Sequence, residues 1–248
     1  MNDIHIKFQT DLLTLGVRRG GVLMVHSSLR SLGAIPGGAE PVIIGLLDVL
    51  GADGTLLMPA LSYEHVTPEH SQFDVNKTPS NVGALPEFFR LRSGTQRSVH
   101  PTHSVCAVGS LASQLLEHHI KDASPCGANS PFHLLPEHDG QILMLGCGLE
   151  PNTSMHAIEE LIEPPYLYDP PLDYHITLAD DTSLTKIYTP HNFRSWQQRY
   201  ERIEQVMING LKRGRVLAAE CYLIEARALW DSALKIMRQE PLYFVSQT

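Results

Sequence analysis

The spacing of apolar residues divides the chain into alternating helices and strands. Apolar positions recur with helical spacing over residues 4–15 and 39–50, and a glycine follows each segment. Short apolar runs at residues 22–26 and 55–58 flank the second of these segments and predict strands. Because a connection of helical length joins the two runs, the strands are expected to pair in parallel.

The same alternation continues along the chain. We expect further strands at residues 106–109 and 142–145, a hairpin over 176–187, an amphipathic stretch at 199–210, and helices at 85–91, 111–119, 153–162 and 226–238. Residues 62–82 hold few apolar positions and two prolines, so they predict a long functional loop. This pattern indicates the α/β class, in one mixed domain with short insertions.

Composition narrows the class of protein. A chain of 248 residues with 43% hydrophobic content is long enough for one large α/β domain. Its net charge of −8 argues against a nucleic-acid binder, which would carry a basic face. Residues 1–20 lack a signal-peptide pattern, no stretch resembles a membrane span, and the four cysteines show no CxxC spacing. We therefore expect a cytoplasmic protein with reduced thiols.

One constellation could carry acid–base chemistry. The strand at residues 142–145 runs into Gly146 and Gly148, and a helix with His156 and Glu159 one turn apart follows. In open α/β sheets the carboxyl ends of strands are where ligands bind. His156 would then be a general base that Glu159 orients. The same spacing fits half of a metal site or a solvated helix face.

Three other segments carry hydrogen-bond donors close to the ends of expected strands or helices. Residues 25–33 are rich in serine and contain Arg30, which could bind a phosphate. The same composition is also found in ordinary polar turns between a strand and a helix. Residues 97–105 contain His100 and His103. This segment could be a ligand-binding loop, a metal site or a structural turn. Ser130 and Pro131 are typical of a helix start, which favours anions although most such starts bind nothing.

In their order and spacing these segments resemble the aminoglycoside 3-N-acetyltransferase family, the antibiotic N-acetyltransferases. The resemblance covers nearly the whole chain. The matching pieces are His26-Ser27-Ser28-Leu29 with Gly33, the run 51–59, Pro79-Ser80 with Gly83-Ala84-Leu85, Arg97-Ser98 with 100–104, Ser130-Pro131-Phe132, Leu145-Gly146, Asn152-Thr153 with His156 and Glu159, and the closing stretch 231–244.

The resemblance implies an α/β/α sandwich around a largely parallel mixed sheet, as a single acetyltransferase domain over residues 1–248. It implies acetyl-coenzyme A as cofactor and no metal. The residues that would hold the cofactor by this resemblance are Ser27, Ser28, Leu29, Arg30, Thr102, His103, Ser104, Val105, Ser130 and Phe132. His156 matches the catalytic histidine of the family, and Glu159 matches its acidic companion.

The expected reaction is acetylation of the 3-amino group of an aminoglycoside antibiotic, by direct transfer with a histidine base. Such a polyamine substrate favours a pocket lined with carboxylates. The candidate substrate residues are Tyr63, Glu64, Asp74, Glu163, Asp169 and His191. A homodimer is compatible with the sequence, and neither nucleic acid nor membrane is an expected partner.

Other functions stay open at this point. The chain is short for the family and residues 62–78 are not rich in acids, so the acceptor could be a different amine. A metal-dependent hydrolase would use His100, His103, His156 and Glu159. A coenzyme A-binding module without catalysis is the last alternative.

Overall fold

The strands of the main sheet lie in the order β10-β11-β6-β1-β2-β5-β4 in the computed structural model, which describes residues 3–248. The strands of the molecule are β1 (Val22–Ser27), β2 (Thr55–Pro59), β3 (Gln72–Asp74), β4 (Gln96–Arg97), β5 (Val105–Gly109), β6 (Gln141–Leu145), β7 (Leu172–Thr177), β8 (Ser183–Tyr188), β9 (Trp196–Gln198), β10 (Leu211–Val216), β11 (Ala219–Glu225) and β12 (Val245–Gln247). The α-helices are α1 (Asp3–Leu15), α2 (Ala39–Leu50), α3 (Ala84–Leu91), α4 (Ala112–Leu116), α5 (Pro131–Leu134), α6 (Ser154–Ile162), α7 (Ile203–Val206) and α8 (Ala226–Met237). Short 3-10 helices are η1 (Leu29–Leu32), η2 (His119–Lys121), η3 (Leu135–His138) and η4 (Tyr200–Arg202).

The centre of this sheet is parallel and its flanks are antiparallel. Strand β1 pairs in parallel with β2 and with β6, as the helical crossover after β1 predicts. The outer pairings β2–β5, β5–β4, β6–β11 and β11–β10 are antiparallel. The buried strands β2 and β6 carry apolar residues on both faces because helices cover the sheet on both sides. The expectation of a mixed α/β fold is confirmed.

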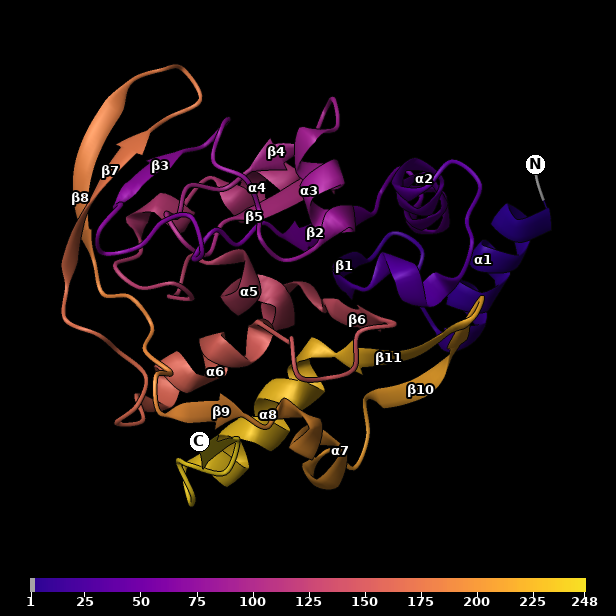
Figure 1. The fold of residues 1–248 in the computed structure, drawn as a ribbon. Helices are drawn as coiled ribbons and strands as arrows, with labels where there is room; N and C mark the ends of the chain where they lie inside the picture. Colours follow the sequence, from indigo (N-terminus) through magenta and orange to yellow (C-terminus); the bar gives the residue numbers. More distant parts are fainter. Residues whose placement is uncertain (1–2) are drawn as a thin grey trace.

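The helices form two layers, each with its own apolar core. Figure 1 shows α1 and α2 to the right of the sheet and α5 and α6 to its left. Phe8, Ile43 and Phe89 belong to the first core, while Phe132, Ile158 and Leu229 belong to the second. The chain leaves β1 toward the α2 layer and leaves the neighbouring β6 toward the α6 layer. Adjacent parallel strands with diverging connections create a crevice beyond their carboxyl ends.

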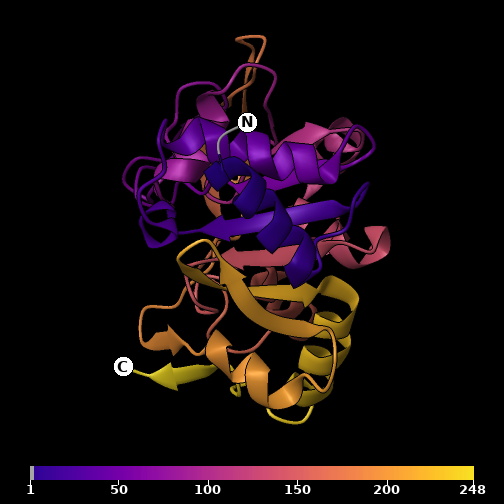
Figure 2. The same ribbon diagram turned by 90° about the vertical axis from the view of Figure 1, so that its right-hand side faces the viewer.

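Two smaller sheets flank this crevice. Strands β3, β7 and β8 form a separate sheet with its own apolar cluster around Phe73, Tyr174 and Tyr188. Its β7–β8 hairpin arches along the side opposite α1 (Figure 1). Strand β12 pairs with β9, and the view in Figure 2 shows this C-terminal part at the end of the molecule away from α2. No helix within residues 3–248 is long and apolar enough to cross a membrane.

The expected helices and hairpin are present, with three differences. The stretch 62–82 is not only loop, because Gln72–Asp74 forms β3 and pairs in parallel with β7. The amphipathic stretch 199–210 contains only the short helices η4 and α7 before β10 begins. Strands β10 and β11 were not expected. Strand β10 lies at the edge of the sheet, and three of its six residues are exposed Lys or Arg, so it carries no apolar run.

Candidate active site

Helix α6 places a histidine and a carboxylate at the crevice. The helix begins after Asn152, whose Oδ1 accepts the Ser154 N–H at 3.2 Å, and Pro164 prevents its continuation. Residues three apart share a helical face, so His156 and Glu159 meet. His156 Nδ1 lies 2.7 Å from Glu159 Oε2, which leaves Nε2 as the free ring nitrogen. The predicted pair is therefore formed in the structure.

Two tyrosine hydroxyls stabilise the Glu159 carboxylate, which is completely buried. Tyr166 donates to Oε1 at 2.8 Å, and Tyr200 donates to Oε2 at 2.9 Å. Burial, followed by the Glu159 charge, holds the pKa of Tyr166 and of Tyr200 well above the usual range. Both hydroxyls remain protonated donors at neutral pH, so each oxygen of the Glu159 carboxylate accepts a tyrosine hydrogen bond.

The His156 ring opens into a cavity of about 430 Å³. The residues that line it are Leu61, Tyr63, Val82, His103, Glu150, Pro151, Thr153, His156, His191, Phe193, Gln198 and Tyr200. A narrower recess of about 110 Å³ lies against the ends of β1 and β6, lined by His26, Ser27 and Cys147 among others. Both spaces are lined by Val82, Pro151 and Thr153, so they adjoin each other at the crevice between the diverging connections.

A second histidine–carboxylate pair lies beside the first. His191 Nε2 is 2.8 Å from Glu160 Oε1, and both side chains are almost fully buried. Ser124 Oγ and the Cys126 N–H also donate to Glu160, at 2.5 and 2.7 Å. Burial is the main cause that holds the pKa of His191 well below its usual range, and burial raises the pKa of Glu160. His191 is therefore neutral at pH 7.

The histidine loop before β5 contributes His103 to the same cavity. Its Nδ1 lies 2.9 Å from Thr102 Oγ1, and burial followed by the neighbouring His191 lowers its pKa well below the usual range. His100 serves a different purpose, because its Nδ1 accepts the backbone N–H groups of Thr102 and His103. The ring of His100 stacks on His119 at 5.1 Å and meets the ring of His103 edge-on at 5.9 Å.

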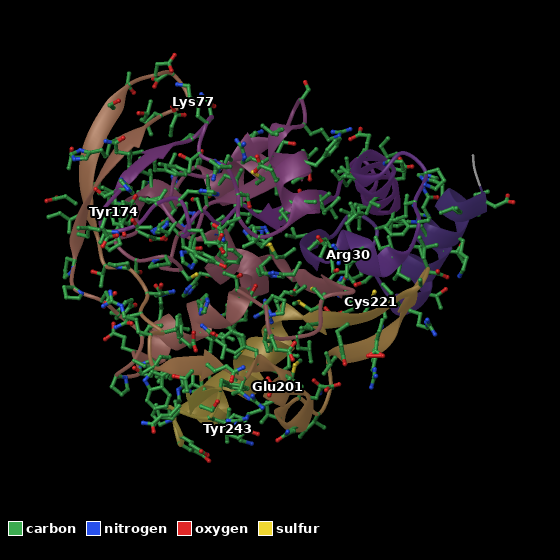
Figure 3. The ribbon with its side chains drawn as sticks, in the orientation of Figure 1. Arg30, Lys77, Tyr174, Glu201, Cys221 and Tyr243 are labelled. Atoms are coloured by element: carbon green, nitrogen blue, oxygen red, sulfur yellow. The ribbon has the colours of Figure 1, made fainter. Side chains whose placement is uncertain are left out.

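Of the four cofactor residues predicted at the end of β1, Ser27 is the one that lines the recess in the described residues. Ser27 ends β1 and lines the recess, and its Oγ is buried without a hydrogen-bond partner in residues 3–248. Ser28 Oγ accepts from Ser31 Oγ at 2.9 Å, and Leu29 packs partly against the α1–α2 core. Arg30 is exposed on η1, where it is labelled in Figure 3.

The other predicted cofactor residues divide into two groups. Thr102 and His103 reach the cavity region as described. Ser104 Oγ instead donates to the Ala60 carbonyl at 2.9 Å and accepts from Arg97, while Val105 is fully buried in β5. Ser130 caps α5 as its sequence predicts, and Phe132 belongs to the second core. None of these last four residues lines either space in the described chain.

Only two of the six predicted substrate residues line the cavity, namely Tyr63 and His191. Glu64 and Glu163 are exposed elsewhere, and Asp169 pairs with Arg194 at 2.7 Å. Asp74 belongs to β3, where it binds the ammonium of Lys77, labelled in Figure 3 at the outer end of this sheet. These four carboxylates therefore neutralise local cations or face solvent, and they do not build the pocket.

The lining or supporting residues that were not expected from the sequence include Glu150, Gln198, Tyr166 and Tyr200. Glu150 lies in the segment between β6 and α6, so the same strand-end argument that selected His156 could have found it. Tyr200 lies 41 positions after Glu159, so no local sequence pattern could have predicted their contact.

An α/β sheet with a cavity and a histidine–carboxylate pair at its switch point has the architecture of an α/β protein that binds a ligand there. The sequence profile of aminoglycoside 3-N-acetyltransferases matches residues 24–238 of this chain. The chain belongs to the aminoglycoside 3-N-acetyltransferase family and is thus an acyltransferase.

Individual relatives agree with this assignment. The chain is 30% identical to aminoglycoside N(3)-acetyltransferase IX of Micromonospora chalcea over 92% of its length and 91% of that protein. The YokD structure from Bacillus subtilis superposes with a TM-score of 0.84 at 27% identity, covering 96% of this chain and 94% of that one. A histidine-to-alanine variant of aminoglycoside acetyltransferase AAC(3)-IVa, in complex with a gentamicin, gives a TM-score of 0.81 at 30% identity, covering 97% and 90%.

Proposed function

We propose that the protein transfers the acetyl group of acetyl-coenzyme A to the 3-amino group of an aminoglycoside, with His156 as general base. The observation that carries this proposal is the free Nε2 of His156 at the cavity, while Glu159 holds Nδ1. The whole of residues 1–248 would act as one acetyltransferase domain. A cytoplasmic location and a homodimer remain predictions of the sequence.

The hydrogen bonds around His156 define its part in the reaction. The amine must lose a proton as it attacks, and His156 Nε2 is the acceptor that faces the cavity. The Nδ1–H donates to Glu159, which fixes this tautomer and stabilises the imidazolium that forms. Tyr166 and Tyr200 compensate the buried carboxylate, so Glu159 need not take the proton itself.

The recess at the ends of β1 and β6 fits the acyl donor. Acetyl-coenzyme A supplies a thioester on a narrow arm, and the narrow recess adjoins the cavity that holds His156. The buried Ser27 Oγ and His26 Nε2 at the recess find no partner in the described residues, so polar atoms of an arm could satisfy them. The exposed Arg30 would reach the phosphates.

Direct transfer is favoured because the recess holds no activated nucleophile. Cys147 lines the recess, but burial raises the pKa of its thiol to about 12, so the thiolate is scarce at neutral pH. In the proposed step a bond forms between the amine nitrogen and the carbonyl carbon, and the carbon–sulfur bond breaks. His156 accepts the proton of the amine, and the departing thiolate takes a proton from water or the imidazolium.

The identity of the acceptor rests on the relatives and on the cavity. The complex of AAC(3)-IVa with a gentamicin supports an aminoglycoside. Within residues 3–248, Glu150 is the one carboxylate that lines the cavity. A polycationic substrate favours a pocket with several carboxylates. That observation supports a second candidate, an amine with fewer charges, acetylated by the same residues.

One assay separates these candidates. Free-thiol release from acetyl-coenzyme A is measured with gentamicin, kanamycin and apramycin, with simple amino sugars and without an acceptor. We expect acceptor-dependent release with a drug, and nuclear magnetic resonance of the product then locates the acetyl group on the 3-amino nitrogen. Release only with simple amines supports the second candidate. Binding of acetyl-coenzyme A without release to any amine contradicts both.

A further inference from the structure

Three histidines from distant parts of the sequence converge at the cavity. His103 precedes β5, His156 lies on α6, and His191 follows β8. One ring nitrogen from each lies within 4.8 Å of the other two. The ring centroids are 5.0 Å apart for His156–His191, 5.3 Å for His103–His191 and 6.0 Å for His103–His156.

One nitrogen of each ring is held by a hydrogen bond to a neighbouring side chain. Glu159 holds Nδ1 of His156, Glu160 holds Nε2 of His191, and Thr102 holds Nδ1 of His103. This leaves one free nitrogen per ring. Histidines that bind metal almost always donate their other N–H in this way, most typically to a carboxylate.

His191 supplies an independent sign of a missing partner. Its Nδ1 is buried and makes no hydrogen bond within residues 3–248, although its side chain is only 4% exposed. A buried polar atom without a partner is costly, and a ligand in the cavity would relieve that cost. Because His191 lines the same cavity as His103 and His156, the unsatisfied nitrogen belongs to the cluster.

We propose that His103, His156 and His191 form a binding site for a divalent transition-metal ion of the zinc type. Imidazole nitrogen suits zinc, copper or nickel, whereas magnesium and calcium prefer oxygen. Zinc–nitrogen bonds of about 2.0–2.1 Å require the three nitrogens, which lie within 4.8 Å of one another, to close to roughly 3.4 Å. The fourth position would open to the cavity and take water.

Metal at this site opposes the proposed acetyl transfer. The ion takes the Nε2 lone pair of His156, which that reaction needs for the amine proton. Zinc is therefore expected to inhibit the enzyme reversibly. This consequence rests on the proposed function, whereas binding of the ion does not.

The binding test uses the metal-free full chain without a polyhistidine tag. Titration with Co²⁺ is followed by the visible absorption of tetrahedral cobalt, and competition with Zn²⁺ gives the zinc affinity. We expect one ion per chain. His191→Asn and His103→Asn should each weaken binding at least tenfold, and Glu160→Gln should weaken it about 10–100-fold by loosening His191.

A matched control is His118→Asn, which removes an exposed histidine that is not part of the cavity lining and should leave binding unchanged. Circular dichroism establishes that each variant is folded. Binding that survives in both folded His191→Asn and His103→Asn proteins, or that is lost in His118→Asn, overturns the proposal.

The activity arm separates this proposal from the proposed function. Zinc should inhibit thiol release with the affinity measured by cobalt competition, and a chelator should restore it. Binding without inhibition keeps the metal site and contradicts His156 as the base. Inhibition without one-to-one binding at the histidines contradicts the metal site and leaves the proposed function intact.

Discussion

Helix α6 carries two histidine–carboxylate pairs that differ in access. Glu159 and Glu160 are consecutive, so they lie about 100° apart around the helix and reach different histidines. The His156 side chain is 12% exposed at the cavity, and its partner Glu159 is held by two tyrosines. His191 is 4% exposed, and its partner Glu160 is held by Ser124 and the backbone of Cys126.

The difference shows that a hydrogen-bonded pair does not by itself make a general base. The bond lengths are nearly equal, 2.7 Å for His156–Glu159 and 2.8 Å for His191–Glu160. What differs is access. The His156 side chain is more exposed at the cavity than that of His191, and Ser124 and the Cys126 backbone join Glu160 to a second segment. Under the proposed function, the first pair carries the catalysis and the second anchors the chain around it.

The largest expected effect is loss of the base. His156→Ala should lower kcat for acetyl transfer by about 10²–10⁴-fold, the usual share of a general base. Steady-state thiol release measures the change, and thermal unfolding shows that the variant is folded. Near-native turnover by the folded variant would overturn the assignment of His156.

Breaking the second pair should cost stability instead. Glu160→Gln leaves a weaker acceptor for His191, Ser124 and the Cys126 N–H, so the free energy of unfolding should fall by about 1–3 kcal/mol. Urea unfolding measures the loss, and kcat should change less than tenfold. A fall in kcat as large as that of His156→Ala would erase the distinction between the pairs.

His119 is a buried histidine whose hydrogen-bond partners are not carboxylates, so it serves as the reference for the two histidine–carboxylate pairs. Burial lowers the pKa of His119 to about 4, and its ring bonds Ser98 Oγ and the Pro125 carbonyl. Since the unfolded chain has the higher histidine pKa, it binds more protons, so stability is complete above about pH 6.5 and falls as pH drops toward 4. Between pH 7 and 5 the loss should be about 2 kcal/mol larger in the wild type than in His119→Gln. Urea titrations at both pH values check this, and equal losses would contradict it.

The smallest effect is expected at Cys147. Because its thiol is protonated at neutral pH and is not the nucleophile of the proposed reaction, Cys147→Ser should keep kcat within about twofold. Thiol release measures kcat, and mass spectrometry of the wild type during turnover should show no acetyl adduct. An adduct at Cys147, or a loss comparable to that of His156→Ala, would argue for an acyl-enzyme.

Local patterns predicted the elements and the first pair but not the second. The bounds of α2 and the contact between His156 and Glu159 depend on residues a few positions apart, where helical spacing is decisive. The contact of His191 with Glu160 spans 31 positions and depends on where the β7–β8 hairpin returns. Strand β3 was missed for the same reason, since its partner β7 lies about a hundred residues further along the chain.

The predicted carboxylates of the pocket fail for a related physical reason. Asp74 and Asp169 were chosen by charge, yet each pairs with a cation close by, Lys77 and Arg194 respectively. Charge alone does not say which way a loop faces. Glu150 was overlooked although it follows a central strand, and its position relative to the sheet, not its charge, brings it to the cavity.

The nine-residue helix α6 also constrains how this chain can vary in length. Each residue added or removed inside it would turn everything that follows by about 100°. One such change between His156 and Glu160 would separate both histidines from their carboxylates at once, even with every side chain preserved. Substitutions there can be accommodated one by one, but insertions and deletions belong in exposed turns such as residues 179–182 between β7 and β8.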